Sequence, residues 1–441
     1  MLGPKKHVSF ASLVHALRAH FEQLPDYRRS GKLRYTLPDV VMSGFACMFF
    51  QDRSLLQFQR RMQDEEQRGN LSSLFGVEHI PEDTQLRDIL DALPSESFRP
   101  LFKEYFARLQ RGKHLEPFRI FGNRYLVSID GTQYFASSEI SCEHCLTKEH
   151  KDRPLTYHHQ ALQAAVVHPA MRQAIPLMAE DIRNEDGKKK QDCETNAAKR
   201  LLDDLRMDHP QLDIVLLGDG LFSHNPMVAA ALEHRMDFIF TAKPDDHKYM
   251  MQWVKDGEAD MPQLRLTQKD GRVFSYRWLN DVPLTGADDA FNVNYFELEI
   301  LVPSPSEDSG FKCTYRCSWV TNLTLTSDNI EEMVKAARCR WKIENECFNN
   351  LKNQGYCLEH NYGHGSQFLA FNFYLLTLLA FVYHQVFELT DHLYQEARQR
   401  WSKVLLWETL RTMIQVFLFQ TWEQLLRHCL APPEIRSPLP P

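Results

Sequence analysis

The 441-residue sequence lacks several features that would assign a class at once: an excess of positive charge, internal repeats, low-complexity tracts and a second long apolar run. Its formal net charge is −7, so the composition as a whole gives no sign of a nucleic-acid partner, and any such contact must depend on local basic segments. Charged residues make up 25% and hydrophobic residues 43% of the chain, as in soluble globular proteins and unlike disordered or fibrous ones.

No signal peptide is recognisable either, so we expect the ten cysteines to be free thiols in a reducing cytoplasm. One uncharged run of twenty residues, Phe368–Phe387, is long enough to span a membrane. Polar side chains within the run, and the lack of a second such run, favour a buried core helix instead. These polar residues are Asn372, Thr377, His384 and Gln385.

Residues 1–115 show apolar side chains at spacings of three and four, with prolines as breaks, which predicts a helical N-terminal domain. The first 35 residues hold seven basic and two acidic side chains, a local charge of +5. Arg28 and Arg29 lie in this segment and are candidates for contacts with phosphate groups. A solvated basic arm without a partner is the alternative.

The pattern changes within residues 120–250, where short β-prone runs replace the helical spacing. Two short strands are predicted around Gly131, with Asp130 at the end of the first. The apolar run 213–218 predicts a strand buried on both faces of a sheet, and the helix and strand after it complete a strand–helix–strand unit. Asp219 follows this buried strand directly, at the edge where open α/β sheets bind ligands.

Residues 251–320 read as a β-rich insertion, residues 321–390 as a return to the core with a long helix, and residues 391–441 as a helical tail. The expected fold class is therefore α/β: a mixed sheet with flanking helices, interrupted by a β-rich insertion and preceded by an all-α domain.

Glu344 stands out because it interrupts a helical apolar stripe. The stripe is formed by Ile330, Val334, Ala337, Trp341, Phe348 and Leu351. An ionised carboxylate on a core-facing side is costly unless it is paired or binds a metal. The alternative is an ordinary pair with Arg340 one helical turn away.

Asp130, Asp219 and Glu344 together provide hard oxygen ligands, which suit Mg²⁺ or Mn²⁺. Two such ions about 3.5–4 Å apart activate a water or a 3′-hydroxyl in phosphodiester transfer. The alternative for the two aspartates is that each caps a turn beside the glycine that follows it.

The segments "SIDGT", "LLGDG" and "RWKIE" resemble the three acidic motifs of bacterial insertion-sequence transposases of the DDE class. They are most similar to the cut-and-paste group with the signature Tyr-x₂-Arg-x₃-Glu-x₆-Lys and a β-rich insertion before the last acid. The resemblance covers about residues 120–390. It implies an RNase H-like core in which Asp130, Asp219 and Glu344 form the catalytic, metal-binding triad.

The same resemblance implies DNA contacts for three further residues. Arg340 matches the signature arginine, which acts near the scissile phosphate, and Trp319 resembles a tryptophan that stacks on a flipped base. A tryptophan in the core of the sheet is the alternative for Trp319. Lys352 follows Glu344 one residue later than the signature lysine, about 80° away on a regular helix, so a phosphate contact needs a bulge. The signature tyrosine is replaced by Ala337.

The function expected from this resemblance is a DNA transposase. It would hydrolyse phosphodiester bonds at insertion-sequence ends and transfer the strands with two Mg²⁺ or Mn²⁺ ions. Its partners would be double-stranded DNA, as terminal inverted repeats and target, and a second copy of the chain on paired ends. It would lie in the cytoplasm on the nucleoid, with no membrane. The alternatives are an RNase H-like nuclease, or an inactive domesticated transposase that acts as a DNA-binding protein.

A second cluster contains Cys142-x₂-Cys145, the spacing of half a zinc site. No single second half is evident from the sequence, and the alternative is a chance pair of cysteines in a loop. Residues that could complete the site are His150, His158, His159, Cys357 and His360.

Overall fold

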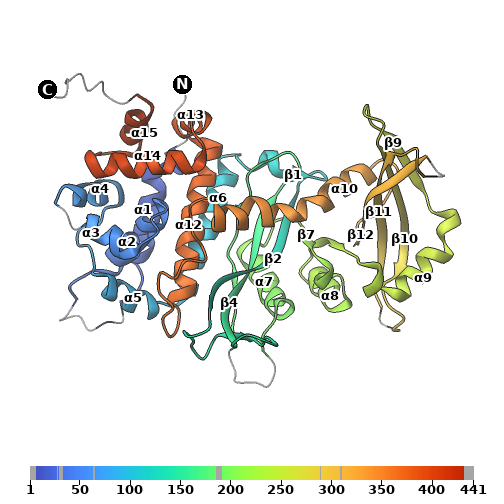
Figure 1. Cartoon of the computed structure of the whole chain (residues 1–441), viewed down its shortest axis with the longest axis horizontal. Coiled ribbons are helices and arrows are strands. Elements are labelled where there is room, and N and C mark those ends of the chain that lie inside the picture. The colour runs from blue at the N-terminus through green and yellow to red at the C-terminus, as the bar shows by residue number, and fades with distance from the viewer. Residues whose placement is uncertain are drawn as a thin grey trace.

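A computed structural model describes residues 6–26, 28, 33–62, 65–184, 191–288, 290–307 and 310–431. The fold is mixed α/β, with a large mixed sheet and many helices (Figure 1). Helices occupy one end of the elongated molecule, and a β-rich part with a single longer helix occupies the other.

Within the described residues the sheet has twelve strands, and its main path runs β3-β4-β2-β7-β8-β12-β11-β10-β9. Strands β2, β7 and β8 are parallel to one another, and the remaining pairs are antiparallel. The strands are β1 (Arg119–Ile120), β2 (Arg124–Ser137), β3 (Leu146–Lys148), β4 (Thr156–Val167), β5 (Ile175–Pro176), β6 (Glu180–Ile182), β7 (Ile214–Gly218), β8 (Asp237–Thr241), β9 (Gln263–Thr267), β10 (Val273–Pro283), β11 (Asn292–Pro303) and β12 (Phe311–Thr321).

Strand β2 differs from the prediction of two short strands around Gly131. It is one strand of 14 residues, because antiparallel β4 keeps its register across the glycine, with Asp130 opposite Gln163 and Gly131 opposite Leu162. Asp130 therefore lies in the middle of a strand and not at the end of one.

The predicted strand–helix–strand unit is present. All five residues of β7 are buried, as the apolar run predicted, and α8 (Asn225–Glu233) connects β7 to the parallel strand β8. Helix α7 (Glu194–Asp208) precedes β7 and packs against the β4–β6 side of the sheet.

The four strands β9 to β12 lie where the β-rich segment was predicted. They do not form a separate sheet: β12 pairs with β8, with Trp319 opposite Thr241, so they extend the central sheet. Helix α9 (Lys248–Asp256) packs against β10 in this part.

Helices precede and follow the sheet in the sequence and pack together at the other end of the molecule (Figure 1). Their core is rich in aromatic rings, such as Phe49, which contacts both Trp407 and Trp422. The helices are α1 (Phe10–Glu22), α2 (Leu37–Phe49), α3 (Leu55–Met62), α4 (Glu65–Phe75), α5 (Asp83–Asp91), α6 (Arg99–Arg111), α12 (Leu369–Thr390), α13 (His392–Arg400), α14 (Lys403–Val416) and α15 (Trp422–Leu430).

Among the described residues, α12 is the one helix long and apolar enough to cross a membrane, and 94% of its most apolar window is buried inside the protein. The polar side chains of Asn372, Thr377 and His384 have protein partners. The Asn372 amide donates to the carbonyls of Leu90 and Leu93, both at 2.7 Å, and accepts from the Ser95 hydroxyl at 2.8 Å. This burial is consistent with a soluble protein.

The helix predicted to carry Glu344 is irregular. It consists of α10 (Ile330–Arg338), the 3₁₀ segment η8 (Cys339–Trp341), the π-helical segment η9 (Ile343–Phe348) and α11 (Asn349–Asn353). The prediction that Trp341 and Glu344 face the core was wrong: Trp341 is 46% exposed and the Glu344 side chain 47%. The change from 3₁₀ to π winding rotates the stripe, so Ile343 and Cys347 are buried instead.

Candidate active site

Asp130 and Glu344 meet at one guanidinium group. The Arg340 Nη1 atom lies 3.3 Å from Asp130 Oδ2 and 2.6 Å from Glu344 Oε1. Glu344 therefore does pair with Arg340 one turn away, but the same group also contacts Asp130 on β2. The helical segment and the central strand thus bring two of the three predicted carboxylates together.

Strand β2 also holds η8 in place. The buried Ser128 hydroxyl donates to the backbone carbonyl of Arg340 at 3.0 Å. Ser128 and Asp130 are two residues apart on a strand, so their side chains lie on the same face. The position of Arg340 over Asp130 is therefore fixed by a backbone contact as well as by charge.

The carboxyl group of Asp130 titrates far above its ordinary range. Burial raises its pKa from 3.8 to about 7; the Arg340 charge opposes this rise, while the charge of Glu344 and a hydrogen bond with it add to the rise. The Gly131 backbone N–H also donates to Asp130 Oδ1 at 2.9 Å. Near neutral pH this carboxyl group is poised between its two protonation states.

Asp219 directly follows β7, the strand that is parallel to β2 and pairs with it. The last registered pair of β2 and β7 is Ser128 with Leu217, and Asp130 and Asp219 each lie two residues further on. Adjacent strands are about 4.8 Å apart, so the two backbones are close. The Asp219 Oδ1 atom accepts from the Leu221 N–H at 2.9 Å and caps the short turn η5 (Gly220–Phe222), as the alternative predicted.

A fourth carboxylate, Glu194, was missed by the sequence analysis. It is the first residue of α7, and its pKa is raised by burial and then by the negative charge of Asp219. The Gln160 amide donates to it. A methyl group on Gly131 would overlap the Glu194 carboxylate. The absence of a side chain at Gly131 therefore leaves the space that the Glu194 carboxylate occupies.

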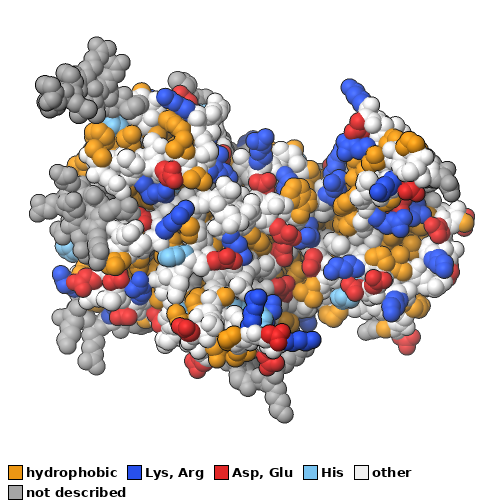
Figure 2. All heavy atoms as spheres, viewed as in Figure 1, with side chains coloured by type: hydrophobic (Ala, Val, Ile, Leu, Met, Phe, Trp, Pro, Cys, Tyr) orange, Lys and Arg blue, Asp and Glu red, His pale blue; other side chains and the backbone are white. Residues whose placement is uncertain are grey.

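Figure 2 shows acidic side chains near the centre of one face, in the region of β2 and β7, and lysine and arginine side chains over β9 to β12.

Lys352 lies on α11, after the π-helical segment, and its Nζ pairs with Glu359 at 2.8 Å. A π turn accommodates one extra residue in a helix. Segment η9 is a bulge of this kind between Glu344 and Lys352. A bulge there is what the predicted phosphate contact of Lys352 requires, because Lys352 follows Glu344 one residue later than the signature lysine.

The other predicted DNA contacts are placed differently. Trp319 is 3% exposed and stacks on Phe296 with ring centroids 5.3 Å apart, so it is a tryptophan of the sheet core, as the alternative held. Arg28 pairs with Asp26 at 2.5 Å and donates to the Tyr35 carbonyl at 3.0 Å. Arg29 lies outside the described residues.

A family model matches the N-terminal part of the chain. Residues 18–106, from within α1 to within α6, match the family model described as DDE_Tnp_1-associated. The chain carries a domain associated with DDE transposase families. A search of the curated proteins finds no match. The matched segment ends before β1 and contains none of the four carboxylates, so it is evidence separate from the acidic motifs.

Proposed function

We propose that the protein is a DDE transposase that cuts DNA at the ends of a mobile element and joins the freed 3′ ends to a target. The observation that carries the proposal is the meeting of Asp130 and Glu344 at Arg340, with Asp219 directly after the strand that pairs with the strand of Asp130. The match of residues 18–106 supports the same class from a different part of the chain.

The proposed core is RNase H-like. In support, β4 and β2 are antiparallel, β6 flanks β4, and β7 and β8 follow β2 in parallel, with α8 as the crossover. The carboxylate of Asp130 lies on the central strand β2, and that of Asp219 directly follows its neighbour β7, at the carboxyl end of that strand.

The donor set consists of carboxylate oxygens, the hard ligands that Mg²⁺ and Mn²⁺ prefer. Asp130 keeps its proton to about pH 7 because it is buried and faces Glu344. A divalent cation would relieve this repulsion, as the proton does. Asp130, Asp219 and Glu344 would hold the ions, which would supply an activated water or 3′-hydroxyl and stabilise the leaving oxygen.

The chain's own residues have distinct parts in this proposal. Arg340 neutralises the two carboxylates and places a positive charge beside the bound phosphate. Glu194 adds a fourth carboxylate close enough to Asp219 for their charges to repel. Lys352, brought round by η9, contacts the DNA backbone, and the basic surface over β9 to β12 in Figure 2 provides further phosphate contacts.

We further propose that the N-terminal helices bind terminal inverted repeats and that two copies act on paired ends. In a bacterial cell the protein would lie on the nucleoid.

The test uses the full chain and the DNA that flanks its gene. Cleavage of labelled element ends in Mg²⁺ is measured for the unchanged protein, for Asp130→Asn and for Glu344→Gln. We expect both substitutions to abolish cleavage while DNA binding, followed by a gel shift, remains. Glu346→Gln is the matched control on the same helical segment and is expected to cut normally. Cleavage that survives Glu344→Gln would refute the assignment.

A pre-nicked element end separates the two enzymatic alternatives, because a transposase yields joined product whereas an RNase H-like nuclease yields only cut DNA. An inactive, domesticated protein would bind the ends and yield neither product.

A further inference from the structure

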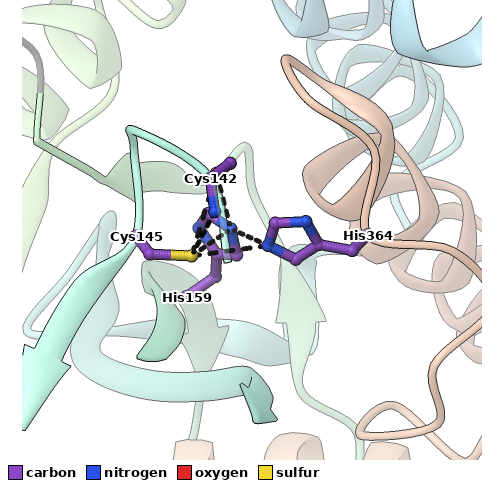
Figure 3. Close-up of side chains that lie close together, drawn as sticks. All are labelled: Cys142, Cys145, His159 and His364. Carbon is purple, nitrogen blue, oxygen red and sulfur yellow. Dashed lines mark hydrogen bonds between the residues drawn. The ribbon is translucent and has the colours of Figure 1, made fainter. Parts of the chain in front are cut away.

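Four metal-ligating side chains meet away from the carboxylates. Cys142, Cys145, His159 and His364 each present one ligand atom, and these atoms all lie within 4.8 Å of one another (Figure 3). The two cysteines come from the loop before β3, His159 from β4, and His364 from the loop between α11 and α12. Among the described residues no other such group of three or more is found.

We propose that these four residues bind one structural zinc ion, and that this ion joins the two parts of the chain that carry Asp130 and Glu344. The binding of zinc does not depend on the proposed function. Only the predicted effect of zinc on DNA cleavage rests on the proposed function.

Five of the six separations are close to those that a tetrahedral zinc ion imposes, and the sixth, between Cys142 Sγ and His364 Nε2, lies within 4.8 Å. Bonds of about 2.3 Å to sulfur and 2.05 Å to nitrogen set S···S, S···N and N···N separations of about 3.8, 3.6 and 3.3 Å. The two Sγ atoms are 3.8 Å apart. The S···N separations are 3.7 Å for Cys142 with His159, 3.5 Å for Cys145 with His159, and 3.4 Å for Cys145 with His364. The two Nε2 atoms are 3.0 Å apart.

The surroundings orient the ligands. The Nδ1 atom of His364 lies 2.8 Å from the carbonyl of Gly365, and donation to that carbonyl leaves Nε2 with a lone pair toward the cluster. The Cys142 backbone N–H points at Cys145 Sγ at 3.4 Å, a contact that favours a thiolate. The ring of Phe135 packs on His364 with centroids 4.5 Å apart and shields one side of the cluster.

The donor set identifies both the metal and its role. Two thiolates and two imidazoles suit zinc and do not suit Mg²⁺ or Ca²⁺. Four protein ligands leave no open position for a substrate, so the site is structural. A disulfide needs the sulfur atoms at about 2.05 Å, well below the 3.8 Å observed.

Half of this site is predictable from the sequence. The Cys-x₂-Cys spacing predicts Cys142 and Cys145, and His159 is among the residues that could complete the set, but His364 is not. His150, another of those residues, lies 3.1 Å from the Thr156 hydroxyl and is not part of the cluster.

The position of the site in the fold explains what it would do. His159 pairs with Phe135 on β2, the strand of Asp130, whereas His364 belongs to the loop that follows the Glu344 segment. That loop is anchored at its far end by Asp91, which accepts the backbone N–H groups of residues 366 to 369 at 2.9–3.0 Å. Gly365, at φ +69°, supplies the turn between the anchor and His364. Zinc at the near end would fix the loop between two points.

The first test is metal content. The full chain, purified from zinc-supplemented medium without chelator, is expected to hold about one zinc per chain by plasma mass spectrometry. His364→Ala and Cys145→Ser are expected to hold at most about a tenth of that amount. The matched controls are His360→Ala in the same loop and Cys193→Ser at an exposed cysteine, and both should keep the full amount.

The second test does not depend on any variant folding. Unchanged protein is stripped of zinc with a chelator and titrated with Co²⁺. We expect saturation near one equivalent, with the strong visible bands of a tetrahedral ion and the near-ultraviolet bands of cobalt–thiolate bonds. Zinc should displace the cobalt and raise Tm. The proposal would be overturned if the purified protein contained no zinc and also gave no such cobalt spectrum. It would also be overturned if His364→Ala kept the full zinc content.

A third measurement separates the zinc site from the proposed function. Zinc loss is expected to lower DNA cleavage in Mg²⁺ and to expose the loop of residues 354–368 to hydrogen exchange. A chain that binds zinc through these ligands but never cuts DNA would retain the zinc proposal and reject the transposase. If zinc loss leaves the hydrogen-exchange protection of this loop unchanged, zinc does not join the two parts of the chain, and that part of the proposal is refuted.

Discussion

Replacing Asp130 with asparagine should stabilise the protein, and increasingly so as the pH rises. Burial raises the pKa of Asp130 from 3.8 to about 7, with Glu344 adding to the rise and Arg340 opposing it. Between these two values the folded protein keeps a proton that the unfolded chain has released. The free energy of unfolding must therefore fall as the pH rises from about 4 to about 7, and remain level above that.

The magnitude follows from the shift in pKa. A rise from 3.8 to about 7, at about 1.36 kcal/mol per unit, sets a ceiling of about 4 kcal/mol for the stability lost at pH 8. The Asp130 side chain is 20% exposed, so part of this cost is relieved by solvent. We expect Asp130→Asn to raise the free energy of unfolding by about 2–4 kcal/mol at pH 8 and by much less at pH 4.5.

The assay is urea unfolding in EDTA at pH 4.5, 6, 7 and 8, followed by tryptophan fluorescence. Asp328→Asn, at an exposed aspartate, is the control and should leave the pH dependence unchanged. If Asp130→Asn and the unchanged protein lose stability in parallel between pH 4.5 and 8, then Asp130 is not the titrating group. The electrostatic account of the site would then be wrong.

Four further predictions follow from the same contacts. Mg²⁺ at pH 8 should raise the Tm of the unchanged protein and leave that of Asp130→Asn nearly constant; equal shifts would count against ion binding at Asp130. Glu194→Gln should lower cleavage by about 10- to 100-fold with DNA affinity retained, since the charge of Glu194 acts on Asp219; unchanged single-turnover rates would refute this. Arg340→Gln removes the charge that lowers the pKa of Asp130, so the rising limb of the pH–rate profile should move to higher pH, and less so in Arg340→Lys. Gly131→Ala should displace the carboxylate end of the flexible Glu194 side chain at little cost in stability and lower cleavage to the level of Glu194→Gln; a fully active variant would show that the overlap is harmless.

The sequence predicted those elements whose side-chain period is clear. The buried strand β7, the crossover helix α8 and the buried helix α12 were recognisable because their apolar runs are long and their boundaries are marked. Strand β2 was divided in two at Gly131, because a glycine usually interrupts a strand pattern. Only the register with β4 shows that this strand continues.

Two residues of the candidate sites could not be found in the sequence. Glu194 begins a helix, where an acidic residue is ordinary, and His364 lies in a loop with other histidines. What distinguishes them is what they approach: Glu194 lies beside Gly131 and Asp219, and His364 lies beside cysteines more than two hundred positions earlier. Strand pairing and loop anchoring bring these neighbours together, and neither produces a periodic pattern in the sequence.

Glu344 was selected for a reason that the structure contradicts, and the contradiction bears on how the site works. A regular helix would have placed its carboxylate toward the apolar core, at the cost of burying a charge. The winding through η8 and η9 places Ile343 and Cys347 there instead, and leaves Glu344 half-exposed at Arg340, where a carboxylate is less costly. The same π turn absorbs the extra residue between Glu344 and Lys352. One local change of winding thus accounts for the solvation of the Glu344 carboxylate and for its contact with Arg340, which argues that η9 is an integral part of the candidate site.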